Sequence, residues 1–438
     1  MSTELFKTTL ISPSRHGIFD AMSGVLFRNF SYITLSQAAN YLIPLITIPY
    51  ISRVVGVEKF GWLEFSYSIV LYFIQLVEYS FDITATRRMA VISHNPILVS
   101  RLFSTVFWSK MILWAASTAL FTLLLVVSST LRGYTLPLIS YYFITFSFVL
   151  SQNWYFQGLQ KLGVVALANV GLKLIFAFLL FIFVKRETDY YLVAVSTTIG
   201  YVLVSILTFW YAFRLIPELR VYYPGFKLII RNIKNGFYIF SAGMANKFYA
   251  LSGMYWAGTL INAAQLGQFS AAHKLFMVVQ SMMFYPVQMT LLPYLSKKMK
   301  EGFDVYKKTF FRYLKWILLA TSLASAFLYM MSPVIFKVLF GEDFLHAYSL
   351  FDLFIPSLVA GVFINLIVYQ AFIHLKRDDL HFKVLFVMMV ISIAGNYAAI
   401  KHYGAAGGAG FRSIMDMLYV LISWRWLSHA FKQHFSKA

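Results

Sequence analysis

The sequence predicts an all-α integral membrane protein, and its composition and the pattern of its apolar runs both indicate this class. Of the 438 residues, 60% are hydrophobic and 12% are charged, and the mean hydropathy is +0.69. Soluble domains are about half apolar and about a quarter charged. The apolar runs are long, and apolar and polar residues do not alternate within them, which excludes a β-barrel. Because lipid offers the backbone no hydrogen bonds, the remaining spanning structure is the α-helix.

Apolar runs of about 20 residues, the length that crosses a bilayer as a helix, recur along the whole chain. We predict about twelve spans, at residues 30–52, 61–80, 104–128, 136–156, 164–184, 190–212, 236–258, 268–294, 314–336, 348–370, 384–401 and 405–427. Between and beyond them we expect five parts: an N-terminal extension (1–29), a six-helix lobe (30–212), an amphipathic linker (213–235), a second six-helix lobe (236–427) and a tail (428–438). Within the extension, residues 1–21 are expected to be either a non-native addition, since Met22-Ser23-Gly24 resembles a translation start, or a segment without regular structure.

Basic residues are distributed unequally between the two sets of loops. Most Lys and Arg residues fall on the side of the N-terminus, and the opposite side carries only Arg53, Lys59, Arg132, Lys185, Arg186, Lys337 and Lys401. Loops rich in Lys and Arg stay in the cytoplasm, so both termini, the linker and the tail are predicted to be cytoplasmic. The net charge of +20 would suggest a nucleic-acid partner in a soluble protein. Here it reflects membrane topology, and no nucleic acid is expected.

Polar side chains follow one face of two predicted spans. In residues 61–80 and just beyond, helical spacing of three, four or seven places five of them on one stripe: Glu64, Ser68, Gln75, Glu78 and Asp82. The span before it has a shorter stripe, formed by Gln37, Asn40 and Thr47. A polar stripe on an otherwise apolar helix predicts the wall of a water-filled cavity.

Four lysines lie within predicted spans. Lys110 lies near the inner end of its span, and we expect its side chain to extend to the interface. For Lys173, Lys247 and Lys274 two interpretations stay open, the same extension to the interface or the lining of a cavity that binds an anion. Residues Arg412 and Asp416 are four apart on one helix and are predicted to form an ion pair.

Two dipeptides suggest that the halves of the chain are related. Phe60-Gly61 and Leu266-Gly267 each follow the first span of a half and open the second. With six spans per half, the halves would be parallel repeats. The chain lacks a nucleotide-binding glycine loop after a strand-like run, and we expect no catalytic residue and no metal site.

Three motifs carry a resemblance to a known family. They are Arg28–Tyr32 followed by Pro44–Gly56, then Ser80–Arg88 with its Ala-Thr-Arg sequence, and Trp154–Gly158 followed by Lys161. Together they resemble the Wzx-type O-antigen flippases. The likeness extends over residues 28–185, and in the second half only hydropathy and spacing agree.

The resemblance implies a fold and a function. The superfamily also holds the MATE exporters and the peptidoglycan precursor flippase, with two six-helix lobes around a central cleft and alternating access. The implied cargo is an oligosaccharide on undecaprenyl pyrophosphate, moved across the bacterial inner membrane. Membrane lipids are further expected partners, and association with polysaccharide polymerase and chain-length proteins stays open. No cofactor is implied, and coupling to H⁺ or Na⁺ also stays open.

The residues that would serve this function are the charged ones named above. We expect phosphate or acidic sugar to contact Arg53, Lys173, Lys247 and Lys274. Cleft polarity or ion coupling would fall to Glu64, Glu78 and Asp82. Three alternatives remain: a MATE-like exporter of small cations, a membrane glycosyltransferase or polymerase on the same lipid carrier, and a scaffold for the assembly machinery.

Overall fold

The chain is helical throughout the part that the structure describes. The computed structural model describes residues 15–372, 374 and 378–435, and no strand occurs among them. The first part of the chain forms α1 (Arg15–Glu78), α2 (Phe81–Ile92), α3 (Pro96–Val127), α4 (Ser129–Arg132), α5 (Thr135–Tyr142), α6 (Ile144–Leu150), α7 (Asn153–Gly158), α8 (Leu162–Phe183), η1 (Glu187–Asp189) and α9 (Tyr190–Leu215). The second part forms α10 (Phe226–Leu260), α11 (Ala263–Glu301), α12 (Phe303–Leu339), η2 (Glu342–Phe344), α13 (Ala347–Ile364), the π-helical η3 (Asn365–Phe372) and α14 (Asp378–Phe435).

Two of these helices each contain two of the predicted spans. In α1 the helical conformation is interrupted at Gly56, with φ 73°, and in α14 at Gly404, with φ 60°. Glycine tolerates positive φ without the clash that a Cβ causes. Eight segments of the described residues are long and apolar enough to cross a membrane, and two of them contain these interruptions. The prediction of an all-α multi-pass membrane protein is confirmed.

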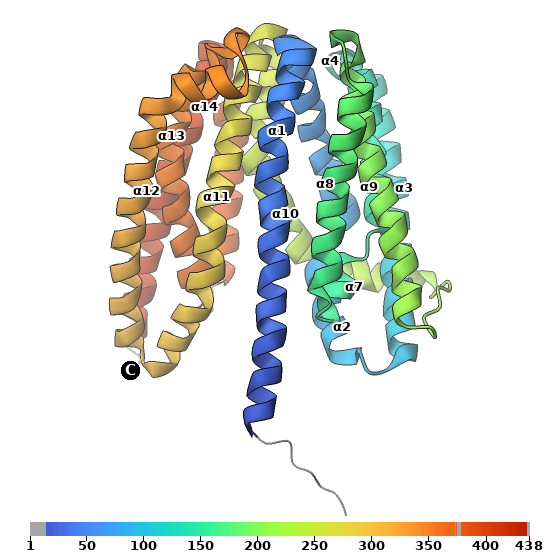
Figure 1. The fold of residues 1–438 in the computed structure, drawn as a ribbon. Helices are drawn as coiled ribbons and strands as arrows, with labels where there is room; N and C mark the ends of the chain where they lie inside the picture. The colour runs from blue at the N-terminus through green and yellow to red at the C-terminus, as the bar shows by residue number, and fades with distance from the viewer. Residues whose placement is uncertain (1–14, 373, 375–377, 436–438) are drawn as a thin grey trace, which may run out of the picture.

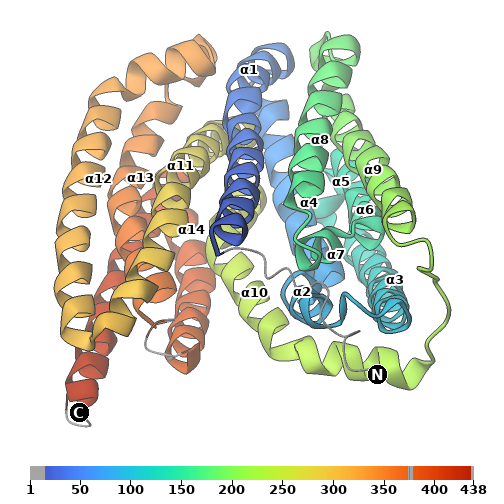
Figure 2. The same ribbon diagram turned by 60° about the horizontal axis from the view of Figure 1, so that its bottom comes forward.

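The helices form two lobes, which we call the N-lobe (α1–α9) and the C-lobe (α10–α14). In Figure 1 the N-lobe helices α3, α8 and α9 lie on one side of α1, and α11–α14 lie on the other. Figure 2 shows that α10 begins below α2 and α3 and then crosses toward the C-lobe. We name the two ends of the bundle after residues of α1, the Gly56 end and the Glu78 end.

The lobes share a hydrophobic core at the Gly56 end. There the Phe60 ring lies 5.9 Å from that of Phe340 and 5.6 Å from that of Phe344, measured between centroids. Both lobes contribute to this core. Toward the Glu78 end there are two separate cores, one in the C-lobe and one in the N-lobe with the start of α10. The lobes are therefore joined at the Gly56 end.

The predicted span at 136–156 is not one helix. It is divided into α5, α6 and the start of α7, with a turn at Phe143 and a second break at Ser151. The Lys110 side chain is only 2% exposed, and its Nζ donates to the carbonyls of Phe148 (2.9 Å) and Ser151 (3.2 Å). Carbonyls at a helix C-terminus lack helical partners and attract positive charge. The expectation that Lys110 extends to the interface was wrong.

The segments between and beyond the lobes are more helical than predicted. In the predicted linker, α9 continues to Leu215 and α10 begins at Phe226. Pro217 and Pro224-Gly225 lie in the irregular stretch between them, where proline cannot extend a helix. Helix α14 continues to Phe435, and α1 begins at Arg15, so residues 15–21 are helical rather than irregular. Residues 1–14 and 436–438 of the predicted extension and tail lie outside the described residues.

The polar stripe of the second span ends sooner than predicted. Helix α1 stops at Glu78, Tyr79 has a φ of 56°, and α2 begins at Phe81. Asp82 therefore belongs to a different helix from Glu64 and Glu78. Its carboxylate accepts a hydrogen bond of 2.9 Å from the Ile83 backbone nitrogen, in the first turn of α2. The inclusion of Asp82 in the stripe was wrong.

Candidate functional site

The charged cavity

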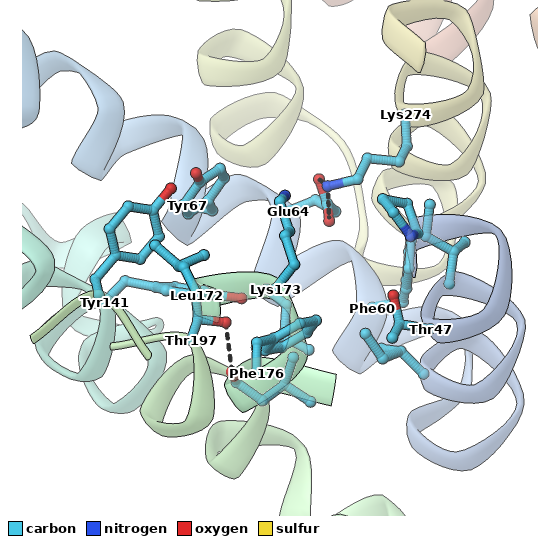
Figure 3. Close-up of a pocket in the computed structure, with 16 residues that line it drawn as sticks. Thr47, Phe60, Glu64, Tyr67, Tyr141, Leu172, Lys173, Phe176, Thr197 and Lys274 are labelled. Atoms are coloured by element: carbon cyan, nitrogen blue, oxygen red, sulfur yellow. Dashed lines mark hydrogen bonds and ion pairs between the residues drawn. The ribbon is translucent and has the colours of Figure 1, made fainter. Parts of the chain in front are cut away.

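A cavity of about 140 Å³ lies where the two lobes meet, and we call it the charged cavity. Its walls come from α1, α5, α8 and α9 of the N-lobe, and Lys274 of α11 reaches it from the C-lobe (Figure 3). Three charged side chains line it: Glu64, Lys173 and Lys274. The structure thus brings together three of the seven residues that the sequence predicted as site residues.

The position of Glu64 opposite Lys274 follows from a close approach of their helices. Gly61 on α1 faces Gly267 on α11, so the two backbones nearly touch. Glu64 lies one turn beyond Gly61, and Lys274 lies two turns beyond Gly267. Residues at such spacings share a face of a helix. The glycine contact therefore directs both side chains into the same space between the lobes.

Glu64 and Lys274 form an ion pair across the lobe boundary. Lys274 Nζ lies 2.9 Å from Oε1 and 3.0 Å from Oε2 of Glu64 (Figure 3). The two side chains are 19% and 30% exposed, respectively. The same ammonium lies 5.9 Å from the ring centroid of Tyr67. Because both side chains are partly buried, each charge compensates the desolvation of the other.

Lys173 extends into the same cavity from α8 (Figure 3). Among the described residues it has no hydrogen bond and no ion pair, whereas Glu64 is engaged by Lys274. The cavity therefore has a formal charge of +1, with Lys173 uncompensated. A half-buried cation without a partner is unfavourable in a membrane protein, and an anion would relieve the cost. The arrangement is suited to binding a phosphate or carboxylate group.

Hydroxyl groups supplement these charges. The cavity is also lined by Thr47, Tyr67, Tyr141, Thr197 and Tyr201. Sequence reasoning found only Thr47 among them, as part of the α1 stripe. The others lacked a detectable signal, because the sequence contains 29 tyrosines and spacing does not distinguish a cavity tyrosine from one at the membrane interface.

Other predicted residues

Glu78 and Lys247 belong to a second charged group, away from the charged cavity. Glu78 interacts electrostatically with Lys110, Asp82 and Lys247. Since an α-helix rises 1.5 Å per residue, the 14 residues from Glu64 to Glu78 place Glu78 about 21 Å from Glu64 along the axis of α1. Six of the seven predicted site residues are thus divided between two groups, one at the charged cavity and one that includes Glu78.

Arg53 lies apart from both groups. Its Nη2 donates a hydrogen bond of 2.7 Å to the carbonyl of Val338, at the end of α12. The neighbouring Ser52 hydroxyl donates to the Phe340 carbonyl at 3.1 Å. Both bonds join the lobes at the Gly56 end. In this structure Arg53 therefore links the lobes and does not line the charged cavity.

A polar cavity also lies within the C-lobe, and sequence analysis did not predict it. It has a volume of about 390 Å³, and its lining includes Asn246, Gln280, Asn365 and Arg412. Arg412 Nε lies 2.9 Å from Asp416 Oδ2, which confirms the predicted ion pair. The Tyr249 hydroxyl also donates to Asp416. The Arg412 charge is therefore compensated within the C-lobe, unlike that of Lys173.

Relation to known proteins

Residues 26–299 match the family described as polysaccharide biosynthesis protein. This is more than half of the chain. The chain belongs to the polysaccharide biosynthesis protein family. The match begins within α1 and ends near the end of α11, and so contains Glu64, Lys173 and Lys274.

Two curated relatives of similar sequence share a name. The chain is 25% identical over 275 residues to the "Putative O-antigen transporter" of Escherichia coli (strain K12), over 62% of this chain and 65% of that protein. It is also 25% identical over 408 residues to the "Putative O-antigen transporter" of Shigella dysenteriae, over 90% of this chain and 98% of that protein. The match therefore spans about two thirds of the first relative and nearly all of the second.

Solved structures with the same fold come from transporters and a flippase. An inward-facing MATE multidrug resistance transporter superposes with a TM-score of 0.70 at 14% identity, over 92% of this chain and 99% of that one. The lipid II flippase MurJ in an inward closed conformation superposes with a TM-score of 0.61 at 15% identity, over 91% of this chain and 87% of that one. An outward-facing MATE transporter superposes with a TM-score of 0.54 at 12% identity, over 92% of this chain and 95% of that one. This member of the polysaccharide biosynthesis family thus has the MATE-like fold, as predicted.

Proposed function

We propose that this protein is a flippase that moves an oligosaccharide on undecaprenyl pyrophosphate from the cytoplasmic to the periplasmic leaflet of a bacterial inner membrane. The observation that carries the proposal is the charged cavity. Lys173 of the N-lobe and Lys274 of the C-lobe line one space between the lobes, and a single carboxylate, Glu64, opposes them. Two ammonium groups can bind the oxygens of a diphosphate through charge-assisted hydrogen bonds. The names of the relatives support a transporter of this class.

The distribution of charge and of hydrophobic cores supports the direction of entry. Basic loops gather at the Glu78 end, which we therefore assign to the cytoplasm together with both termini. The lobes have separate cores at that end and a shared core at the Gly56 end. A head group made in the cytoplasm would thus enter an inward-facing protein. The higher TM-score with the inward-facing MATE structure supports the same assignment.

A flippase must also let the polyprenyl tail remain in lipid. Sugar hydroxyls lose their hydrogen bonds in hydrocarbon, so only the head group needs a polar route. Helices α1 and α11 lie together near the Gly56 end and diverge toward the Glu78 end in both views (Figures 1 and 2). We assign the exit of the tail to the side between these two helices.

The ion pair suggests how binding is linked to movement of the lobes. A diphosphate that binds Lys173 also competes with Glu64 for Lys274. Glu64 is then free to bind a coupling cation, H⁺ or Na⁺. Alternating access next requires the Gly56 end to open, which separates Phe60 from Phe340 and Arg53 from Val338. A MATE-like exporter of small cations is disfavoured, because the lysines of the charged cavity outnumber its carboxylate.

Leaflet exchange in proteoliposomes tests the proposal. Vesicles with purified protein would contain a fluorescent undecaprenyl-pyrophosphate oligosaccharide, and an impermeant glycosidase would report sugar at the outer surface. We expect the lipid to exchange between leaflets faster than in protein-free vesicles. The rate would be measured with and without H⁺ and Na⁺ gradients. Lys173→Ala should lower the rate by about 10-fold or more, the value of one lost charged hydrogen bond. Lys401→Ala, which removes an exposed lysine, is the matched control.

The outcomes distinguish the alternatives. No exchange under any gradient, with folded protein, would contradict the flippase. Release of a small fluorescent cation from the same vesicles would then favour the exporter. Lengthening of the oligosaccharide by the purified protein would favour the glycosyltransferase or polymerase. Exchange that is equal in Lys173→Ala and wild type would leave a flippase but remove the charged cavity from its mechanism.

A further inference from the structure

A second cavity of the N-lobe lies beside the charged cavity and contains no charge. It has a volume of about 400 Å³ and is bounded by α1, α6, α7, α8 and α9. Among the described residues that line it there is no Asp, Glu, Lys, Arg or His. Most of the lining is nevertheless polar, with amides and hydroxyls that include Gln37, Asn40, Asn153, Asn169 and Thr208. We call it the neutral cavity.

One wall of the neutral cavity is a chain of hydrogen-bonded side chains between α8 and α1. Asn169 Nδ2 donates to Ser36 Oγ at 2.6 Å and to Asn40 Oδ1 at 3.1 Å. Asn40 Nδ2 in turn donates to Gln37 Oε1 at 3.4 Å. Among the described residues, the amide nitrogen of Gln37 and the amide oxygen of Asn169 have no partner. This wall thus retains an unpaired amide NH₂ group as donor and an unpaired amide oxygen as acceptor.

The other walls supply acceptors. The hydroxyls of Ser147, Ser205 and Thr208 donate to carbonyls of their own helices at 2.6, 2.9 and 3.0 Å. A hydroxyl that donates its hydrogen still has lone pairs to offer. Polar residues that only hold membrane helices together would pair across one interface. Here they surround a volume within the usual range for small-ligand sites, about 300–1,000 Å³.

The neutral and charged cavities are adjacent. Leu172 and Tyr201 line both. On α8, Asn169 and Lys173 are one turn apart, about 6 Å along the axis. On α1, Asn40 precedes Thr47 along a helix that runs toward the Gly56 end. The neutral cavity therefore lies on the Glu78 side of the charged cavity.

We propose that the neutral cavity binds the first, uncharged sugar of the head group while the charged cavity holds the diphosphate. This inference rests on the proposed function. In a sugar diphosphate the phosphate is bonded directly to the anomeric carbon, so the two sites must be neighbours, as these cavities are. A sugar presents several hydroxyls that both donate and accept, and the amides and hydroxyls of the lining match them. A carboxylate there would meet no cation in the lining, so an acidic first sugar binds less well.

Binding in detergent tests this assignment without requiring transport. The probes are undecaprenyl pyrophosphate without sugar and the same lipid with one N-acetylglucosamine. We expect the wild-type protein to prefer the second. Asn169→Ala combined with Thr208→Val should weaken binding of the sugar-bearing lipid by about 10-fold, as for the loss of two neutral hydrogen bonds. Affinity for the sugarless lipid should stay unchanged.

Two controls make the result specific. Thr198→Val removes another buried hydroxyl of α9 that lines neither cavity, and it should change neither affinity. Lys173→Ala should weaken both lipids alike. Equal wild-type affinity for the two lipids, or a double variant that weakens both equally, would overturn the assignment. A wild-type protein that discriminates between the lipids but exchanges neither across vesicles would instead contradict only the flippase.

A third probe tests the selectivity. The same lipid bearing one glucuronic acid should bind at least several-fold more weakly than the N-acetylglucosamine lipid. Thr208→Lys adds a cation to the lining and should reduce the difference in affinity between these two lipids. Tighter binding of the acidic lipid by the wild-type protein would contradict a neutral sugar site.

Discussion

Gly61 and Gly267 pack directly against each other across the boundary between the lobes. A Cβ on Gly61 would lie 2.7 Å from the Gly267 nitrogen, and a Cβ on Gly267 would clash with the carbonyl of Val57. Real Cβ atoms do not approach backbone this closely. The two dipeptides that suggested related halves thus meet at one contact, and the lobes can close at the Gly56 end because both residues are glycine.

Gly267→Ala should therefore open the Gly56 end. The chain has no cysteine, so a single Ser52→Cys substitution can report on this interface, where Ser52 is 1% exposed. We expect maleimide to label this cysteine about 10-fold faster when Gly267→Ala is added. This corresponds to a loss of ~1.4 kcal/mol from the free energy that favours the closed interface. Gly410→Ala is the matched control, because a Cβ there meets nothing within 4 Å. Equal labelling rates for Ser52→Cys with and without Gly267→Ala would show that the close glycine contact does not hold the interface shut.

The ion pair between Glu64 and Lys274 should compete with anion binding. Glu64→Gln keeps the shape of the side chain but releases Lys274. We expect pyrophosphate, measured by isothermal titration in detergent, to bind about 10-fold more tightly to this variant. Lys274→Met should weaken binding by a similar factor.

Thermal unfolding provides the complementary measurement for this pair. Lys274→Met leaves the Glu64 carboxylate without its cation and should destabilise the protein by about 1 kcal/mol, since both side chains are partly solvated. Adding Glu64→Gln to it should recover most of that loss. Additive destabilisation by the two substitutions would show that the pair does not couple the lobes energetically.

Lys110 should matter for stability rather than for substrate. Lys110→Met preserves the length of the side chain but leaves the carbonyls of Phe148 and Ser151 without their donor. A buried acceptor that loses its partner costs about 1–3 kcal/mol. We expect a lower unfolding temperature in detergent with unchanged pyrophosphate affinity, and no change for the exposed control Lys401→Met. An unfolding temperature equal to that of the wild type would contradict the role assigned to Lys110.

The local parts of the fold were predictable from sequence, and the long-range parts were not. Arg412 and Asp416 were predicted as a pair because four residues of helix fix their separation. At the second break of the span at 136–156, the freed carbonyls of Phe148 and Ser151 are bonded by Lys110, which is remote in sequence, and no local pattern in 136–156 shows this contact. Likewise, helical spacing placed Glu64 on a polar face but could not indicate that Lys274, 210 residues away, would pair with it.

Lys247 provides the sharpest test of how the predicted site residues divide. The sequence placed Lys173, Lys247 and Lys274 in one anion-binding role, whereas in the structure Lys247 interacts with Glu78 and does not line the charged cavity. We expect Lys247→Ala to leave pyrophosphate affinity unchanged within a factor of about two, because Lys247 does not line the charged cavity and interacts instead with Glu78. Lys173→Ala, measured in parallel, should weaken it by about 10-fold. If the two variants lose affinity equally, the anion contacts both lysines, and the head group extends from the charged cavity to the Glu78 end.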